Sequence, residues 1–304
     1  MFSYTKEQKV FDLMGKKVGG LPGENPTMML GSVFYEGHYK EPKASQDEAL
    51  ELINQQETHS KGLGLNSITD IFIYTMSELE WKIEFALDNI DGFFSLDMPE
   101  SSVRIEALKY LGEHGGLERT LYNSLNLGVT EEELKMLAAN TPAAVILLGY
   151  DPMNNSTQGR LDMIKNGGSL LEKGLLQLAE DFRIENILLD TAATPFGEGA
   201  SESLRAVPVF KSEFGLPVGC AMHNTLESWL WLQDQPEKQS FTKLLDPAID
   251  VIPVVLGADF IHYGPMDNYQ EEFLTVAMVD KLMAEGAESY FGTEIGKHHP
   301  YHKI

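Results

Sequence analysis

The stretch TLYNSLNLGVTEEELKMLAANTPAAVILL, residues 120–148, holds one complete unit of the fold. It begins with the short apolar segment Thr120–Tyr122 and ends with the apolar run Ala144–Leu148, which has the length of a strand. Between them, Thr130–Glu133 fits a capping box, in which a hydroxyl and a carboxylate accept free backbone N–H groups at a helix start. The stretch therefore predicts a strand, a helix over 131–139 and a second strand. Runs that are apolar on both faces are typical of parallel strands covered by helices.

The same alternation recurs along the 304 residues. Eight strand–helix pairs match a TIM (β/α)8 barrel, of which about 250 residues is the typical size. A doubly wound open sheet is the alternative, because periodicity does not show whether a sheet closes. The predicted strands are Thr27–Val33, Leu63–Thr69, Gly92–Leu96, Thr120–Tyr122, Ala144–Leu148, Ile187–Leu189, Pro217–Ala221 and Ala258–Tyr263, and the predicted helices span 46–60, 77–89, 101–114, 131–139, 170–182, 201–213, 225–234 and 269–285.

Two segments depart from the alternation. Residues 1–24 form an N-terminal hairpin extension, in which Lys9–Leu13 and Lys16–Gly19 are the two strands, and we expect it to close the bottom of the barrel. The connection Gly149–Gly168 is long and polar, which favours a lid or a binding loop. Because no interdomain linker is visible, residues 1–304 are predicted to be a single domain.

Two further capping boxes, Ser45–Glu48 and Ser169–Glu172, predict helix starts. The tail His298–His302 contains three histidines, which could bind a metal adventitiously. A flexible terminus is the better interpretation of this tail.

The composition excludes several classes of protein. With 43% hydrophobic residues the chain can bury a full core, so disorder and coiled coil are poor interpretations. Its net charge of −23 argues against nucleic acid and anionic membranes as partners. The single cysteine, Cys220, allows no internal disulfide and no cysteine-based zinc site. The sequence shows neither a signal peptide nor a membrane-spanning run, so we expect a soluble, cytoplasmic protein.

The ends of the predicted strands carry acids, amides and histidines, and in a TIM barrel the active site lies at these ends. A pair of carboxylates can hold the amino group and the ring N–H of a pterin or guanine-like edge, and carboxamides can contact the remaining ring atoms. Taken singly, each Asp or Asn could merely cap the next helix. Two aspartates and two asparagines together, Asp97, Asn123, Asp190 and Asn224, predict a polar ligand site. The other polar residues at or near strand ends are Asp151, His223, and His262 with Tyr263.

Several barrel chemistries are disfavoured. No lysine ends a predicted strand, which argues against a Schiff-base aldolase. The turn Gly197–Ser201 contains a glutamate that would repel phosphate, so a strand-to-helix turn is the better interpretation. His223, His262 and Asp190 could together bind a catalytic metal. However, no typical metal-binding spacing is present, structural histidines are more common, and no metal is predicted.

Five segments carry a resemblance to a known family, and they are Gly19–Glu24, Leu121–Asn126, Gly159–Gly174, Leu188–Ala192, and Phe214–Gly219 followed by His223-Asn224. Over nearly its whole length the sequence is similar to the H subunit of archaeal tetrahydromethanopterin S-methyltransferase. It looks closer still to bacterial relatives, the methylcobalamin:tetrahydrofolate methyltransferases linked to glycine betaine demethylation. The resemblance implies a TIM barrel shared with other pterin-binding methyltransferases, and a homodimer.

The resemblance also implies roles for four strand-end residues. Asp97, Asn123 and Asp190 fall where the wider pterin-binding group holds the pterin ring. Asn224 falls where a carboxamide contacts N5, the nitrogen that carries the methyl group. Asp97 is followed by Met98-Pro99, where small polar residues would be expected. Further candidate pocket residues are Asp151, Gly219, His223 and His262.

We therefore predict a methyltransferase that moves a methyl group between a methylated corrinoid and N5 of tetrahydrofolate. The corrinoid is methylcobalamin or a corrinoid protein. Asn224 would hydrogen-bond N5, and Asp97 or Asp190 would relay a proton if burial raises its pKa. The alternatives are a methanopterin-specific enzyme, a non-catalytic subunit that scaffolds a corrinoid protein, and another pterin enzyme such as a dihydropteroate-synthase-like ligase. The scarcity of Lys and Arg at strand ends argues against the ligase.

Overall fold

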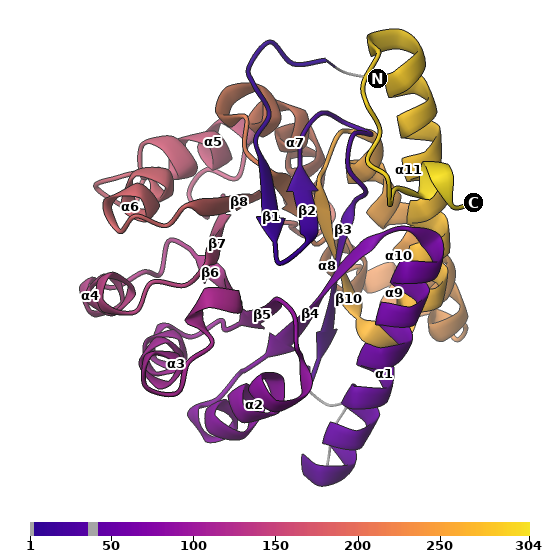
Figure 1. The fold of residues 1–304 in the computed structure, drawn as a ribbon. Helices are drawn as coiled ribbons and strands as arrows, with labels where there is room; N and C mark the ends of the chain where they lie inside the picture. Colours follow the sequence, from indigo (N-terminus) through magenta and orange to yellow (C-terminus); the bar gives the residue numbers. More distant parts are fainter. Residues whose placement is uncertain (1–2, 36–41) are drawn as a thin grey trace.

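Eight parallel strands close into a barrel in the computed structural model, which describes residues 3–35 and 42–304. The helices lie outside this ring (Figure 1). The predicted TIM barrel is confirmed, and an open sheet is excluded because β10 pairs with both β3 and β9. In order around the barrel, the strands are β10 (Phe260–Pro265), β3 (Met28–Val33), β4 (Asn66–Phe72), β5 (Phe94–Asp97), β6 (Thr120–Leu125), β7 (Ala144–Leu148), β8 (Asn186–Asp190) and β9 (Val218–Cys220).

β4 starts later than predicted, and β6 ends later than predicted. β4 begins at Asn66 rather than Leu63, because the preceding helix continues through Leu63. Gly64, with φ +80°, then reverses the chain in a conformation that favours glycine. β6 continues to Leu125. Asn123 therefore lies within a strand, where pairing with both neighbouring strands fixes its backbone.

The helices follow the predicted alternation, except that the predicted helix 225–234 is divided into two short helices and that two further helices were not predicted. α10 (Lys238–Val255) is absent from the sequence prediction, and it contains Pro247 and Pro253, which usually interrupt helices. α5 (Thr157–Lys165) lies inside the segment predicted to be a long loop. Among the helices of the described residues, none is long and apolar enough to cross a membrane. The others are α1 (Pro42–Leu63), α2 (Met76–Asn89), α3 (Ser101–His114), α4 (Glu131–Ala139), α6 (Leu175–Asp181), α7 (Ala200–Phe214), α8 (His223–Glu227), α9 (Leu230–Gln233) and α11 (Tyr269–Phe291), with the short 3-10 helices η1 (Leu117–Arg119), η2 (Met266–Asn268) and η3 (Pro300–His302).

The three predicted capping boxes have different outcomes. Thr130 precedes α4, and its hydroxyl accepts a hydrogen bond from the Glu133 backbone N–H at 3.2 Å. The Glu133 carboxylate, however, binds Arg104. Ser45 lies within α1 rather than at its start, and Ser169 lies before α6 and donates to a carboxylate of the preceding loop. The predictions for Ser45 and Ser169 are wrong, and for Ser169 the reason is that a charged acceptor elsewhere in the fold makes a stronger hydrogen bond than a helix end does.

The N-terminal hairpin plugs the amino end of the barrel, as predicted. β1 (Val10–Leu13) and β2 (Lys16–Gly19) pair antiparallel. Val18 is fully buried among the side chains that fill the barrel interior. Asn66, the first residue of β4, donates its side-chain N–H to the Lys17 carbonyl at 2.8 Å. The hairpin therefore seals the end opposite the predicted site, which leaves the carboxyl ends of the strands as the accessible end.

The C-terminal tail is ordered, which contradicts the expectation of a flexible terminus. η3 packs against α11, and Tyr301 donates its hydroxyl to Glu288 at 2.6 Å. His299 is fully buried, and this burial lowers its pKa to about 4. The polar composition of the tail suggested mobility, but packing against α11 supplies contacts that the tail's own sequence does not reveal.

Three carboxylates are buried where α10 packs against α11. Asp246, Asp250 and Glu272 are at most 4% exposed. Neither oxygen of Glu272 has a hydrogen-bond partner among the described residues. Burial, followed by the charges of Asp250 and Asp246, raises the pKa of Glu272 to about 10. Glu272 is therefore protonated at neutral pH, because ionisation would place an uncompensated charge in the protein interior.

Glu272→Gln is expected to raise the free energy of unfolding at pH 8 and to leave it nearly unchanged at pH 4. The pKa of this carboxyl rises from its usual 4.5 to about 10 on folding. Its contribution to stability is therefore intact below pH 4.5 and is lost as the pH rises toward 10. Keeping it protonated at pH 7 costs about 3 kcal/mol. Urea denaturation measures the change, with Glu271→Gln as the control on a partly exposed neighbour. Equal stabilisation at both pH values would contradict the prediction.

Candidate active site at the mouth of the barrel

A cavity of about 910 Å³ opens at the carboxyl ends of the strands. Among its lining residues that the structure describes, none is Lys or Arg. The barrel brings six of the eight predicted site residues together here, from strands that are far apart in the sequence. They are Asp97 on β5, Asn123 on β6, Asp190 on β8, His223 and Asn224 on α8, and His262 on β10.

Asp97 and Asn123 lie side by side at this mouth, as partners across the β5–β6 pairing. Asp97 is partly buried. Burial raises its pKa well above the usual range, the charges of Asp70 and Asp190 raise it further, and Arg104 opposes them. Burial and the neighbouring acids therefore favour the protonated form of Asp97, and in that form the carboxyl donates as well as accepts hydrogen bonds.

Asp70 of β4 is an acid that the sequence interpretation missed. It is fully buried, and one of its oxygens accepts a hydrogen bond from Ser32 at 2.9 Å. Its other oxygen has no partner among the described residues. The available signal was a single acid among the uncharged residues of the segment Ser67–Phe72. Its charge favours the protonated form of Asp97.

Asp190 ends β8 in a different environment. One carboxylate oxygen accepts the Ala192 backbone N–H at 2.6 Å, and the other lies 4.0 Å from Nε2 of His262. Burial raises the pKa of Asp190, while His262, the Ala192 hydrogen bond and Arg160 oppose the increase. Asp190 therefore has its own hydrogen-bond and charge partners, and its charge in turn raises the pKa of Asp97.

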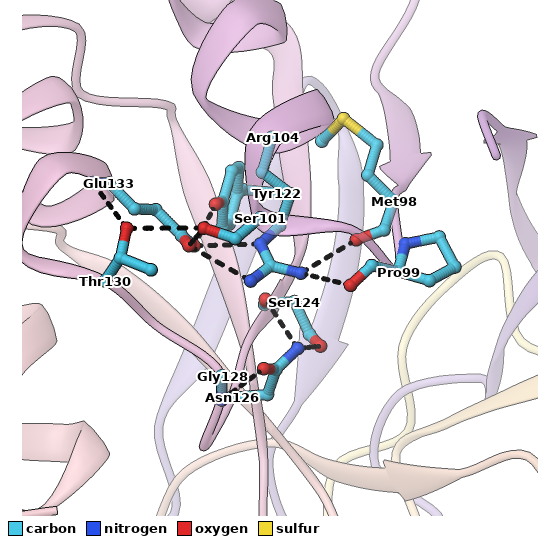
Figure 2. Close-up of polar contacts among 10 residues, drawn as sticks. All are labelled: Met98, Pro99, Ser101, Arg104, Tyr122, Ser124, Asn126, Gly128, Thr130 and Glu133. Carbon is cyan, nitrogen blue, oxygen red and sulfur yellow. Dashed lines mark hydrogen bonds and ion pairs between the residues drawn. The ribbon is translucent and has the colours of Figure 1, made fainter. Parts of the chain in front are cut away.

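Arg104 on α3 holds the segment that follows Asp97. Its Nη1 donates to the carbonyls of Met98 at 3.1 Å and Pro99 at 2.7 Å. Its Nε and Nη2 donate to the two oxygens of Glu133 at 2.8 and 3.0 Å (Figure 2). Both charged side chains are at most 1% exposed. Arg104 contacts the backbone carbonyls of Met98 and Pro99 and not their side chains. The unexpected side chains at these two positions therefore leave the hydrogen bonds to Arg104 intact.

Glu133 extends the same network to the strand that carries Asn123. The Tyr122 hydroxyl and the Ser101 hydroxyl each donate to its carboxylate at 2.6 Å (Figure 2). Tyr122 immediately precedes Asn123 in β6. One buried ion pair therefore supports the backbone beside both Asp97 and Asn123.

Arg160 of α5 holds the segment after Asp190 in a similar way. Its Nη1 donates to the carbonyls of Thr191 and Ala192, each at 2.7 Å. Ala192 has φ +57°, a left-handed conformation that is uncommon for residues other than glycine. The Ala192 N–H donates to the Asp190 carboxylate, and the Ala192 carbonyl accepts from Arg160. Arg160 and Arg104 were both missed, because their acceptors are backbone carbonyls that no sequence motif marks.

The opposite side of the mouth carries His223, His262 and Asn224. Nδ1 of His223 lies 2.8 Å from the His262 carbonyl, to which it donates. Burial lowers the pKa of His223 to about 4, so this ring is neutral and its Nε2 is an acceptor. Asn224 is exposed at the cavity. Its carboxamide is therefore accessible to a ligand.

The remaining two predicted residues lie outside the cavity lining. Asp151 is 1% exposed, and it accepts hydrogen bonds from the backbone N–H of Met153 and of Ser169, each at 2.9 Å. It therefore joins the two ends of the loop that contains α5. A Cβ on Gly219 would lie 2.2 Å from the Phe260 carbonyl oxygen, so this glycine allows β9 to approach β10 closely. Both residues shape the fold around the site instead of facing its cavity.

The sequence also raised the alternative of a metal site formed by His223, His262 and Asp190. Within residues 3–35 and 42–304, no group of three or more His, Cys, Asp or Glu could hold a metal ion. His223 uses one ring nitrogen for the His262 carbonyl. The cavity instead offers carboxylates, carboxamides and neutral imidazole, a set that suits a flat ligand rich in N–H and ring nitrogen groups.

Two dihydropteroate synthases of known structure have a similar fold. The enzyme from Yersinia pestis in complex with a sulfonamide drug superposes with a TM-score of 0.63 at 15% identity, over 91% of this chain and 100% of that chain. The enzyme from Coxiella burnetii in complex with pteroic acid gives 0.60 at 17% identity, over 89% and 98%. At these identities the likeness shows the fold alone.

Sequence comparison is more specific. The H subunit of tetrahydromethanopterin S-methyltransferase from Methanothermobacter marburgensis is 36% identical over 310 residues, covering 100% of both chains. The H subunit of the putative methyltransferase mtx from Methanosarcina acetivorans is 36% identical over 306 residues, covering 99% of this chain and 98% of the relative. The family model described as tetrahydromethanopterin S-methyltransferase MtrH subunit matches residues 6–295. The chain therefore belongs to the family of the tetrahydromethanopterin S-methyltransferase MtrH subunit.

Proposed function

We propose that this protein transfers a methyl group between a methylated corrinoid and N5 of a reduced pterin, with tetrahydrofolate as the pterin. The observation that carries the proposal is the convergence of Asp97, Asn123, Asp190 and Asn224 on one cavity at the mouth of the barrel. Family membership supports methyl transfer as the reaction class.

The four side chains divide into two groups by their chemistry and their position. Asp97, Asn123 and Asp190 lie at or in strands, where the pairing of the barrel fixes them. A pair of acids can accept hydrogen bonds from the amino group and a ring N–H of the pterin, while a carboxamide contacts the ring oxygen or nitrogen. Asn224 lies beyond the strands on α8. It would therefore contact the other end of the ring, where N5 is located.

The reaction balances without any further oxidant or reductant. In the direction that forms methylpterin, the N5 lone pair attacks the methyl carbon. The cobalt–carbon bond breaks, and its electron pair remains on cobalt as Co(I). N5 then loses its proton. In the reverse direction Co(I) attacks the methyl group, and N5 takes up a proton. A neutral carboxamide at Asn224 can donate to N5 or accept from it, and the N5 proton is exchanged with water at the open mouth of the barrel.

A tetrahydromethanopterin substrate is the second candidate, favoured by the names of relatives that are 36% identical to this chain. The two pterins share the bicyclic ring that the four side chains would hold. The test is an assay of the purified chain with methylcobalamin and each pterin in turn, following Co(I) by its absorbance and methylpterin by chromatography. Transfer to tetrahydrofolate supports the proposal. Transfer to tetrahydromethanopterin alone would identify the second candidate. Transfer to neither would indicate a non-catalytic subunit.

The corrinoid has to approach from outside the barrel, because the hairpin seals the other end. A corrinoid protein is therefore a partner that we propose for this chain. The relatives' names describe subunits, which agrees with a reaction that is divided between proteins.

We also infer a homodimer. The exposed faces of α10 and α11, two helices that pack together, carry large apolar side chains at helical spacing. Burying such a face is favourable, and the resemblance noted from the sequence implies the same assembly. Light scattering after size exclusion should give twice 33.9 kDa, and Met278→Glu should give the monomer mass. A monomeric wild type would contradict the inference. The residues are Leu244, Ile252 and Val255 on α10 and Leu274, Met278 and Leu282 on α11.

A further inference from the structure

An exposed group of apolar side chains borders the cavity. We define it as the aromatic rim, formed by Phe196, Trp229, Leu230 and Trp231. Leu230 is 78% exposed, Trp231 51% and Phe196 47%. Phe196 directly follows Pro195, which lines the cavity. The rings of Phe196 and Trp229 meet edge to face with their centroids 5.2 Å apart. The rim is therefore continuous with the mouth of the barrel.

Ring packing holds the rim in place. The centroids of Trp229 and Trp231 are 4.7 Å apart. Trp231 in turn stacks on Phe241 of α10 at 6.3 Å, with the two rings inclined by 7°. Trp229 also packs against a buried cluster that includes Met222 and Leu226. The rim is thus a supported surface whose outer faces remain in water, and a supported apolar patch in contact with solvent marks a binding surface.

The position of the rim relates it to one particular reactant. Trp229 follows Asn224 by five residues, on the segment that joins α8 to α9. In the proposed reaction the pterin lies against the strand ends with N5 near Asn224, so the methyl donor has to cover the mouth above N5. A donor in that position extends beyond the cavity on the side of α8 and α9, which is where the rim lies.

The chemistry of the rim also fits this reactant. A corrin is a broad, flat macrocycle whose periphery carries methyl groups and amide side chains. Aromatic faces pack well against a methyl-bearing edge, and an indole N–H can donate to an amide oxygen. Trp combines both properties on one rigid side chain, and the rim contains two of them.

We propose that the aromatic rim binds the edge of the corrin ring and so orients the cobalt–methyl bond toward N5. This inference rests on the proposed function. It assigns to Trp229, Leu230, Trp231 and Phe196 the recognition of the methyl donor, while Asp97, Asn123 and Asp190 recognise the acceptor.

The test measures binding, so that it does not depend on turnover. Methylcobalamin is titrated by calorimetry into protein that contains no pterin, so that no methyl acceptor is present, for the wild type, Trp231→Ala and Leu230→Ser. Truncating a Trp or an exposed Leu at a contact should weaken the binding of methylcobalamin about tenfold. Tyr290→Ala removes an aromatic side chain that is 79% exposed at the end of α11, and it is the matched control. The binding of tetrahydrofolate and the thermal unfolding of each variant should match those of the wild type.

The outcomes separate this inference from the proposed function. Weaker methylcobalamin binding in both rim variants, with normal binding in Tyr290→Ala, supports the inference. Binding within about twofold of the wild type in both variants overturns it, and so does a wild type that does not bind methylcobalamin. If the wild type binds methylcobalamin through the rim but transfers no methyl group to either pterin, the proposed reaction fails while the rim assignment stands.

Discussion

Asn224→Ala is expected to lower the rate of methyl transfer about 100-fold while changing the dissociation constant of tetrahydrofolate by less than about threefold. Three other polar groups at the mouth would still hold the ring, so ground-state binding survives. The contact with N5 changes as the methyl group moves, and only interactions that strengthen in the transition state accelerate the reaction. Single-turnover kinetics with methylcobalamin measures the rate, and calorimetry measures the affinity.

The matched control for this prediction is Asn126→Ala. Asn126 also lines the cavity, but its carboxamide is already bound to Ser124 and to the Gly128 N–H within its own turn (Figure 2). Its removal should affect the rate much less than that of Asn224. Unchanged turnover in Asn224→Ala would remove this residue from the mechanism. A large loss of tetrahydrofolate affinity would instead assign it to binding of the ring.

Arg104→Met is expected to lower the free energy of unfolding by about 3–5 kcal/mol. The substitution leaves the Glu133 carboxylate fully buried with no cation, and it leaves the carbonyls of Met98 and Pro99 without their donor. Removing one partner of a buried pair is far more costly than replacing both. Urea denaturation of the single variant and of the double variant Arg104→Met with Glu133→Met measures the effect, and the double variant should regain part of the loss.

A second measurement on Arg104→Met addresses the site itself. Arg104 lowers the pKa of Asp97, against burial and the charges of Asp70 and Asp190. Without this cation the pKa of Asp97 should rise, so any pH dependence of pterin binding that comes from Asp97 should move to higher pH. Lys109→Met, which removes an exposed cation from the same helix, is the control. A loss of less than about 1 kcal/mol together with an unchanged pH profile would show that the ion pair supports neither the fold nor Asp97.

The comparison of Arg104 with Asp97 illustrates what sequence patterns can reveal. Asp97 could be predicted because it ends an apolar run, and the ends of parallel strands gather at one mouth in a barrel. Arg104 could not be predicted, although it is needed to hold the same segment. Its acceptors are two backbone carbonyls and a glutamate on another helix, 29 residues away. Charged residues on amphipathic helices ordinarily face water, so a buried one leaves no separate mark on the sequence.

The errors in the local predictions have a related cause. Ser169 was assigned to a capping box by its neighbours in sequence, but in the fold it lies beside Asp151 and binds that carboxylate. α10 was missed because Pro247 and Pro253 contradict a helix locally, whereas the apolar face of α10 packs against the barrel and α11. The tail was expected to be flexible because its composition is polar. In the fold it packs against α11, and its composition does not reveal those contacts.

By itself, the sequence determined the alternation of strands and helices, the presence of eight such pairs, and the set of polar strand ends from which a pterin site was predicted. These features are encoded by residues close together in the chain, through the period of the hydrophobic pattern and the position of each strand end. The tertiary structure alone decided which of those ends face one cavity, which buried cations hold them, and which acids keep a proton. Each of these depends on burial and on partners distant in the chain, and both arise only when the barrel closes.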